Sequence, residues 1–393
     1  MKDHPQLFGV MIDGYRPFKE FVAKLRQLEV IVGANGAGKS ALIEFLRMLR
    51  DGMDREIPPG LVAGGTGRRV YHTPGPEQIG WRIRVDWPDN TIIEYLGDLS
   101  GLVGNEVAEE VVLRDTLSKT SEGATVFDKL LVMKHGRGFM SETGVTDRIG
   151  DLVAFRIDKF ALGSISNPSM TSLIKLREHI RGWRFYSSFD INSNEIRQPV
   201  MLEQAPVLAE DCRNLSSVIQ YLKNEEGAAY DELNHYLRLL VPGFRELKVR
   251  AFGARGQVLA FWREDGLDDD LSLADLSDGI LRLICWTLLC VVPHPPTLIC
   301  IDEPDQGVHP RTLPILAELF QKVSERTQVI VTTHNSYFLS QFDLDSISVM
   351  RKEDGRAKFL RPQDSQVLVD MLQDFGSDEI ELLHRSDELE RLA

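Results

Sequence analysis

The sequence predicts an α/β protein with a mixed β-sheet core, an antiparallel β layer and a lobe made mainly of helices. Three observations predict this fold class. Residues 28–50 have the pattern of an apolar strand, a glycine-rich turn and a helix, and residues 70–95 alternate between apolar and polar side chains. Residues 297–335 contain two wholly apolar strands that flank a helix, which is typical of parallel strands buried on both faces.

The composition fits a globular protein. The chain has 393 residues, 43% of them hydrophobic and 26% charged, which is enough for a core divided into roughly two lobes. The N-terminus lacks the basic and apolar regions of a signal peptide, and the apolar stretch 281–292 is interrupted by Arg282 and too short to span a bilayer. We therefore expect a cytoplasmic protein without a membrane segment.

Cysteine usage and charge narrow the classes of partner. The four cysteines form no CxxC pair and show no zinc-site spacing with histidine, which predicts buried, reduced thiols. The net charge of −14 disfavours a protein that binds nucleic acid over its whole surface. Two basic clusters are typical of solvated faces, and their lysine and arginine side chains are also the candidates for a local DNA-binding face. They comprise Arg68, Arg69 and His72, and Lys175, Arg177, His179, Arg181 and Arg184.

The stretch GANGAGKS, residues 33–40, matches the phosphate-loop (P-loop) pattern GxxxxGK[ST] between an apolar strand and a helix. Its glycines let backbone N–H groups turn toward a polyphosphate, and the N-terminus of the helix faces the same negative charge. We expect Lys39 to reach the β- and γ-phosphates as a catalytic residue and Ser40 to ligate Mg²⁺. The predicted nucleotide-binding residues of the loop are Asn35, Gly36, Ala37, Gly38, Lys39, Ser40 and Ala41.

The middle of the chain supplies the antiparallel layer and the helical lobe. The alternating segments WRIRVDW and NTIIEY are joined by Pro-Asp-Asn, which indicates a hairpin. Residues 165–245, including the start of PGFREL, carry apolar positions three and four apart and are expected to be mainly helical. The segments LKVRAFG and QVLAFWRE indicate a second hairpin before an acidic stretch.

Two acids and a histidine follow the apolar strands near the C-terminus. Asp302 ends the strand TLICID, where a carboxylate is placed to hold Mg²⁺ beside the phosphates. Glu303 follows it and is the candidate general base that activates water. His334 comes 31 residues after Glu303, the length of a helix and a strand, so a β-α-β crossover predicts neighbouring strand ends. We expect His334 to be catalytic and to sense the γ-phosphate.

The stretch LSDG, residues 276–279, is expected at a helix start, with Ser277 as a favoured N-cap residue. Together with the P-loop and the acidic strand end, it resembles the ATP-binding-cassette (ABC) ATPases, whose LSxGx signature has this position in the chain. The resemblance implies an ABC-type P-loop NTPase with ATP and Mg²⁺ as cofactors. It also implies that Ser277 and Gly279 bind the γ-phosphate of ATP held by a second copy, so that ATP joins a homodimer.

Within the ABC ATPases the chain resembles the RecF, SMC and OLD branch, and the bacterial AAA15/AAA21-like predicted ATPases. Tyr15-Arg16-Pro17-Phe18 resembles the turn that precedes the branch's P-loop, which implies that Arg16 helps to bind nucleotide. IDEPDQGVHP resembles its DEPExxLHP segment. The glutamine of the family's Q-loop has no counterpart in FALGSISNPSM, and Gln78 is a poor substitute.

These features divide the chain into four predicted ranges. Residues 1–160 form a first ATPase lobe with the P-loop and the antiparallel layer, and residues 161–272 form the helical lobe with its hairpin. Residues 273–350 supply the signature helix, the Asp302 strand and His334, which complete the ATPase core. Residues 351–393 form a C-terminal segment.

The resemblance implies an ATP-hydrolysing switch that forms a head-to-tail dimer. It is expected to be the sensor of a DNA-repair, anti-phage or anti-plasmid system and to act with a separately encoded effector. One alternative is an OLD-like nuclease component, for which Asp343 and Asp345 supply a DxD pair. Another is the nucleotide-binding subunit of an ABC transporter, which the hairpin layer disfavours.

Overall fold

The computed structural model describes residues 4–57, 70–100, 106–119, 125–142, 151–188, 194–252, 256–375, 378–386 and 388–392. The chain divides into two compact units that interleave along the sequence, whereas the sequence analysis placed its domains in consecutive ranges. Unit 1 comprises Met1–Gln27, Gly33–Trp183 and Ser348–Arg361. Unit 2 comprises Leu28–Val32, Arg184–Ile347 and Pro362–Ala393.

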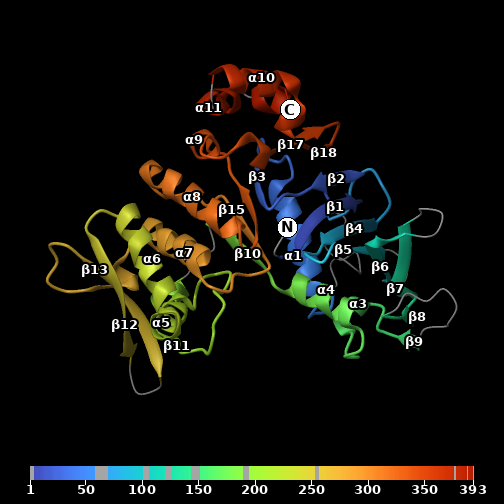
Figure 1. The fold of residues 1–393 in the computed structure, drawn as a ribbon, viewed down its shortest axis with the longest axis horizontal. Helices are drawn as coiled ribbons and strands as arrows, with labels where there is room; N and C mark the ends of the chain where they lie inside the picture. Colours follow the sequence, from blue (N-terminus) through green and yellow to red (C-terminus); the bar gives the residue numbers. More distant parts are fainter. Residues whose placement is uncertain are drawn as a thin grey trace. The chain divides into compact units, whose positions relative to one another are not determined.

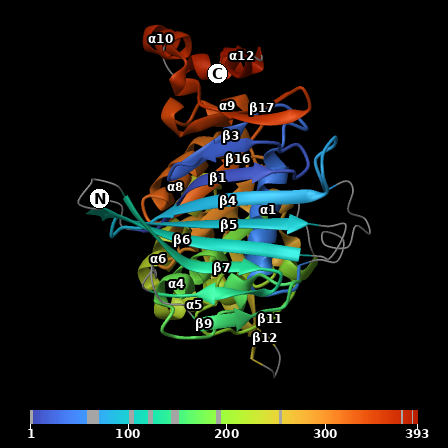
Figure 2. The same ribbon diagram turned by 90° about the vertical axis from the view of Figure 1, so that its right-hand side faces the viewer.

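Unit 1 contains an eight-stranded antiparallel sheet, parts of which are visible as adjacent arrows in Figure 2. The predicted hairpin is confirmed as its third and fourth strands, and alternation places Trp81, Ile83 and Val85 on the buried face. The sequence analysis left the strands after residue 100 undecided. In spatial order the strands are β2 (Phe21–Lys24), β1 (Gln6–Asp13), β4 (Gln78–Asp86), β5 (Thr91–Ser100), β6 (Glu106–Lys119), β7 (Thr125–Lys134), β8 (Arg137–Met140) and β9 (Asp151–Ala154).

The helices of unit 1 include the predicted helix after the P-loop. Residues 39–52 form it, and its apolar side chains Leu42, Phe45, Leu46 and Leu49 are buried, as their spacing requires. An antiparallel hairpin from the C-terminal part of the chain completes the unit. These elements are α1 (Lys39–Gly52), α3 (Ala161–Ser164), α4 (Thr171–Arg181), β17 (Ile347–Glu353) and β18 (Arg356–Leu360).

His179 of α4 is buried in unit 1 between two tryptophan rings. Its ring centroid lies 5.5 Å from that of Trp87 and 6.0 Å from that of Trp183. Burial lowers the pKa of His179 from its usual 6.5 to about 3, because the imidazolium form is poorly solvated there. This residue therefore belongs to the core, and the sequence analysis was wrong to count it with a basic face.

His179 is expected to make stability depend on pH. Its folded pKa lies below its unfolded pKa, so the unfolded state binds the proton first as the pH falls below 6.5. The free energy of unfolding should then fall by about 1.4 kcal/mol per pH unit from this residue. Urea unfolding of the wild type and His179→Phe between about pH 7 and pH 5.5 measures this slope. A wild-type-minus-variant difference that is constant with pH would contradict the assignment.

Unit 2 contains four neighbouring strands, β10 (Trp183–Ser187), β15 (Leu298–Asp302), β16 (Gln328–Thr332) and β3 (Leu28–Val32). The last three pair in parallel, and their side chains are buried from Leu28 through Val32 and from Gln328 through Thr332. α8 (Leu313–Ser324) connects β15 to the parallel strand β16, so the predicted β-α-β crossover is confirmed. Figure 1 labels β15 and α8. Consequently, β15, β16 and β3 end at the same edge of the sheet.

The rest of unit 2 contains the helical lobe. The predicted helices are confirmed as α5 (Leu215–Glu225) and α6 (Gly227–Leu240), and the predicted second hairpin as β12 (Phe244–Phe252) and β13 (Gln257–Glu264). The helical interpretation of PGFREL was wrong, because its Phe244 begins β12 directly after a turn at Gly243. The remaining elements are β11 (Val200–Met201), β14 (Leu271–Ser272), α7 (Asp278–Val291), α9 (Ser336–Leu339), α10 (Gln366–Phe375), α11 (Asp378–Arg385) and α12 (Glu388–Leu392).

Two further expectations concern thiols and membranes. All four cysteines are buried, as predicted: Cys212, Cys285, Cys290 and Cys300. Among the residues that the structure describes, none of the helices combines the length and the apolar character needed to cross a membrane.

Candidate functional site

The P-loop is shaped by glycines that no other residue can replace without strain. Gly33 has a φ of +150°, and a Cβ built on it would lie 2.0 Å from the backbone oxygen of Met350. Gly38 has a φ of +115° and is the N-cap of α1. A residue with a Cβ rarely adopts such angles, so the glycines of the motif are required by the backbone path.

The Lys39 side chain folds back onto the P-loop and binds its backbone. Its ammonium group donates to the backbone oxygen of Gly33 at 2.7 Å and to that of Ala34 at 3.3 Å. The side chain is buried, whereas Asn35, Gly36 and Ser40 are exposed at the mouth of the loop. Because the N-cap Gly38 has no side chain, it cannot cap the first N–H groups of the 14-residue helix α1. The loop and the helix start therefore fit an anionic ligand such as a polyphosphate.

Arg16 approaches the same helix. Its Nη1 forms an ion pair with Glu44, which lies in the second turn of α1. Arg16 has a φ of +47°, and its N–H donates to the backbone oxygen of Val70 at 2.7 Å. The structure thus places Arg16, a predicted nucleotide-binding residue, beside α1. Arg16 and all the predicted P-loop residues through Ala41 belong to unit 1.

Asp302 and Glu303 lie at the carboxyl end of β15. The Thr332 hydroxyl, at the end of the neighbouring strand β16, donates to Asp302 Oδ1. The Glu303 N–H donates to the backbone oxygen of Thr332 at 3.1 Å. Glu303 has a φ of +53°, which is uncommon for a residue with a Cβ, so its surroundings must hold this conformation.

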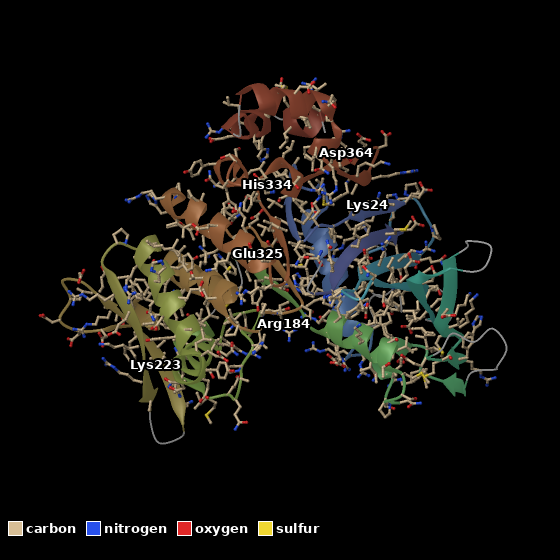
Figure 3. The ribbon with its side chains drawn as sticks, in the orientation of Figure 1. Lys24, Arg184, Lys223, Glu325, His334 and Asp364 are labelled. Atoms are coloured by element: carbon tan, nitrogen blue, oxygen red, sulfur yellow. The ribbon has the colours of Figure 1, made fainter. Side chains whose placement is uncertain are left out.

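The Glu303 carboxylate is contacted on both oxygens. Gln306 Nε2 donates to Glu303 Oε2, and His334 Nε2 lies 3.5 Å from Glu303 Oε1. His334, labelled in Figure 3, follows the end of β16, and its side chain is about one third exposed at 33%. The predicted proximity of Glu303 and His334 is therefore present. A histidine beside a carboxylate can donate a hydrogen bond to it or to a nearby anion.

Asp305 gives the segment after β15 a second anchor. The Thr333 hydroxyl donates to Asp305 Oδ1 at 2.8 Å. Burial raises the pKa of Asp305 above its usual value, and this hydrogen bond opposes the rise. Asp305 therefore binds the chain between β16 and α9 and is not directed toward solvent as a catalytic acid.

The LSDG segment begins α7, as predicted. The Ser277 side chain is the N-cap and accepts from the N–H of Ile280 at 3.4 Å. Arg197 holds the segment in place, because it donates to the backbone oxygen of Leu276 at 2.8 Å and pairs with Asp278. A cavity of about 400 Å³ opens at this tip. Its lining includes Ser277, Gly279, Ile280, Gly307, His309 and Arg311.

Three residues of unit 2 were not predicted from the sequence: two contact the candidate catalytic residues, and the third contacts one of these two. Gln306 holds the Glu303 carboxylate, Ser188 contacts both Asp302 and Glu303, and Arg282 donates to Ser188. The spacing of three residues between Glu303 and Gln306 was a usable local signal. Ser188 gave none, because more than a hundred residues separate it from Glu303 in the sequence.

Several of the cationic side chains that were predicted to bind DNA form ion pairs with carboxylates of the same chain. Lys175 pairs with Asp89 at 3.2 Å, and Arg181 pairs with Asp54 at 2.7 Å. Arg177 pairs with the neighbouring Glu178. Arg68 and Arg69 lie outside the described residues. Pairing with carboxylates reduces the net positive charge that this face can offer to a phosphate backbone.

The predicted Mg²⁺ site requires only a few ligands from the protein. Within the described ranges, His, Cys, Asp and Glu side chains form no group of three or more that could hold a metal ion. Asp343 is the N-cap of a short 3-10 helix, Leu344–Ser346, that contains Asp345. Mg²⁺ in nucleotide sites needs only one or two protein ligands, since phosphate oxygens and water supply the others.

Comparison with known proteins gives a family match over part of the chain and a fold over most of it. Residues 156–340 match the family model for an AAA domain described as putative AbiEii toxin, Type IV TA system. No curated protein matches the chain. The match includes Ser277, Asp302, Glu303 and His334, and stops short of the P-loop.

Solved structures of Smc heads are similar along most of the chain. An SmcHead bound to the C-winged helix domain of ScpA is 15% identical with a TM-score of 0.52, over 90% of this chain and 97% of that one. A Pyrococcus furiosus Smc head domain bound to the C-terminal domain of ScpA is 12% identical with a TM-score of 0.50, over 94% and 100%. The likeness to the Smc heads shows that the chain has the fold of a P-loop NTPase, and the family match supports an AAA-type domain over residues 156–340.

Proposed function

We propose that the chain hydrolyses ATP as a molecular switch, in which two copies close head-to-tail on two ATP molecules. The observation that carries this proposal is the shared edge of β15, β16 and β3. Asp302, Glu303 and His334 follow two of these strands, and the peptide bond from Val32 to Gly33 leads from the third into the P-loop. Ligands of α/β sheets bind at such carboxyl edges.

The residues divide the work of hydrolysis. The P-loop N–H groups and Lys39 would bind the phosphates, with Arg16 contributing beside α1. Glu303 would accept a proton from the attacking water, and His334 would donate to the γ-phosphate. Ser40 and Asp302 would hold Mg²⁺, which supplies charge neutralisation of the phosphate oxygens when bound.

The cavity at the start of α7 supports the dimer. Ser277 and Gly279 lie at the N-terminus of the 14-residue helix α7 and line a cavity of about 400 Å³. The γ-phosphate of the ATP held by a second copy would bind there. Closure requires contacts that distinguish ATP from ADP, and the γ-phosphate at Ser277 would supply them. Loss of this phosphate on hydrolysis would reopen the pair.

The biological role is inferred from the family match. The matched family is described as a putative AbiEii toxin of a type IV toxin–antitoxin system, which favours a role in anti-phage or anti-plasmid defence over DNA repair. We propose that the closed dimer is read by a separately encoded effector protein in the cytoplasm. The internal pairing of Lys175, Arg177 and Arg181 makes a protein partner the first to test, ahead of DNA.

Complementation between two inactive variants tests the composite site. Lys39→Ala removes the lysine that binds phosphate, and Ser277→Arg blocks the tip that contacts the other copy. Each variant alone is expected to lack ATP hydrolysis. A mixture should recover activity up to about a quarter of the wild-type rate, because half of the dimers carry one site with both parts intact. Phosphate release after mixing measures the recovery.

The control for complementation is a mixture of the Lys39→Ala variant with a double variant that carries both Lys39→Ala and Ser277→Arg. Its sites all lack the lysine, so it should remain inactive at every ratio. Full activity of Ser277→Arg alone would show that hydrolysis needs no second copy. Absence of recovery, with both variants folded and dimeric, would contradict the head-to-tail arrangement.

A further inference from the structure

Arg282 connects the start of α7 to the end of β15. It lies about one helical turn after Gly279, on the same face of the helix. Its Nε donates to the backbone oxygen of Ser188 at 3.0 Å. Arg282 is partly buried, and it belongs to unit 2, as do Ser188 and Gly307, which it contacts.

Ser188 in turn forms hydrogen bonds with the backbone of the candidate catalytic residues. Its hydroxyl donates to the backbone oxygen of Glu303, and its N–H donates to that of Asp302 at 3.3 Å. The serine is fully buried, at 0% exposure. Since Glu303 has the uncommon φ of +53°, a hydrogen bond to its carbonyl helps to fix the direction of its side chain.

A second path runs through Gly307. A Cβ built on Gly307 would lie 1.8 Å from Arg282 Nη1, so the guanidinium packs directly on this glycine. A Cβ built on Gly279 would lie 2.6 Å from the Gly307 backbone oxygen. The preceding residue, Gln306, donates to the Glu303 carboxylate. Movement of the α7 start would therefore displace the segment that holds this carboxylate.

We propose that Arg282 is a positioning residue for Glu303, which links the phosphate-contacting tip of a chain to the general base of the same chain. The inference rests on the proposed function. In the proposed dimer, the tip and the base of one chain serve different ATP molecules. Binding of the partner's γ-phosphate at Ser277 then fixes Glu303 through Arg282, so the two sites hydrolyse ATP cooperatively.

Arg282→Ala is the direct test. The variant is expected to lose about 10- to 100-fold in kcat, because a base displaced by about 1 Å is poorly placed for proton transfer. Its affinity for ATP should stay near the wild-type value, since the P-loop is unchanged. The Hill coefficient for ATP should fall toward 1, and millimolar guanidinium should restore part of kcat. Arg282→Lys, which keeps a cationic donor, should retain more activity than Arg282→Ala.

Ser188→Ala and Arg326→Ala separate positioning from stability. Ser188→Ala removes only the hydroxyl on the path and should lower kcat in the same direction. Arg326 donates to the backbone oxygens of Cys290 and Val292 at the other end of α7, so its variant is the matched control. Arg326→Ala should lower Tm without changing the Hill coefficient or kcat at temperatures where it is folded.

The outcomes distinguish this inference from the proposed function. A folded Arg282→Ala with wild-type kcat and Hill coefficient would overturn the inference, even if ATP-dependent dimers form. A loss of kcat that merely follows a loss of folded protein, with no rescue by guanidinium, would also overturn it. Failure of the wild type to dimerise would instead refute the sandwich, and the Hill coefficient of the wild type would then be 1.

Discussion

Glu303→Gln is expected to lower kcat for ATP hydrolysis by about 10²- to 10⁴-fold, the usual contribution of a general base. The amide has the size of the carboxylate and can still accept from Gln306, so the local structure should persist. It cannot accept the proton of the attacking water. Because ATP would then bind without turnover, the closed dimer should accumulate.

Phosphate release measures the first effect of Glu303→Gln, and size-exclusion chromatography with light scattering measures the second. The variant should be dimeric with ATP and monomeric with ADP. Glu318→Gln, an exposed position on α8, makes the same chemical change away from the site and should behave as the wild type. A Glu303→Gln protein that stays monomeric with ATP would contradict the sandwich. If Glu303→Gln hydrolysed ATP at the wild-type rate, another residue would have to be the general base.

Lys39→Ala is expected to lower kcat/KM for ATP by at least about 100-fold, because a charge-assisted contact to the transferring phosphate is lost. Lys39 now binds the Gly33 and Ala34 carbonyls, so its ammonium group already lies within the loop that would surround the phosphates. Removing it should also weaken ATP binding.

Calorimetric titration with a slowly hydrolysed ATP analogue measures the binding loss caused by Lys39→Ala, and phosphate release measures the rate. Lys223→Ala, on the exposed surface of α5 and labelled in Figure 3, is the control for removal of a lysine. Unchanged analogue binding by Lys39→Ala would contradict the assignment of residues 33–40 as the phosphate site.

The parallel core could be predicted because its signals are strong and local. The apolar runs 298–301 and 329–331 lie in buried strands, and the 31-residue spacing of Glu303 and His334 admits only one crossover helix. The antiparallel sheet was predicted only in part. Its later strands, such as β6 and β7, were not predicted, because pairing with neighbouring strands, rather than local pattern, decides the structure there.

Local pattern failed where distant partners decide the role of a side chain. PGFREL carries helical spacing, yet Phe244 pairs with Glu264 of β13, because cross-strand pairing outweighs a weak helical preference. The same holds for charge. Lys175 and Arg181 form a basic run in the sequence, but Asp89 and Asp54 are brought to them by the fold.

The motifs whose residues are neighbours in the chain could be found without the structure: the P-loop through Ser40, the signature at Ser277 and the acidic end of β15. A short motif specifies its own backbone path through glycines, caps and apolar runs. The connection from this signature through Arg282 and Ser188 to Glu303 became visible only in the folded chain. Such contacts depend on how α7, β10 and β15 pack, and packing joins residues whose separation in sequence carries no signal.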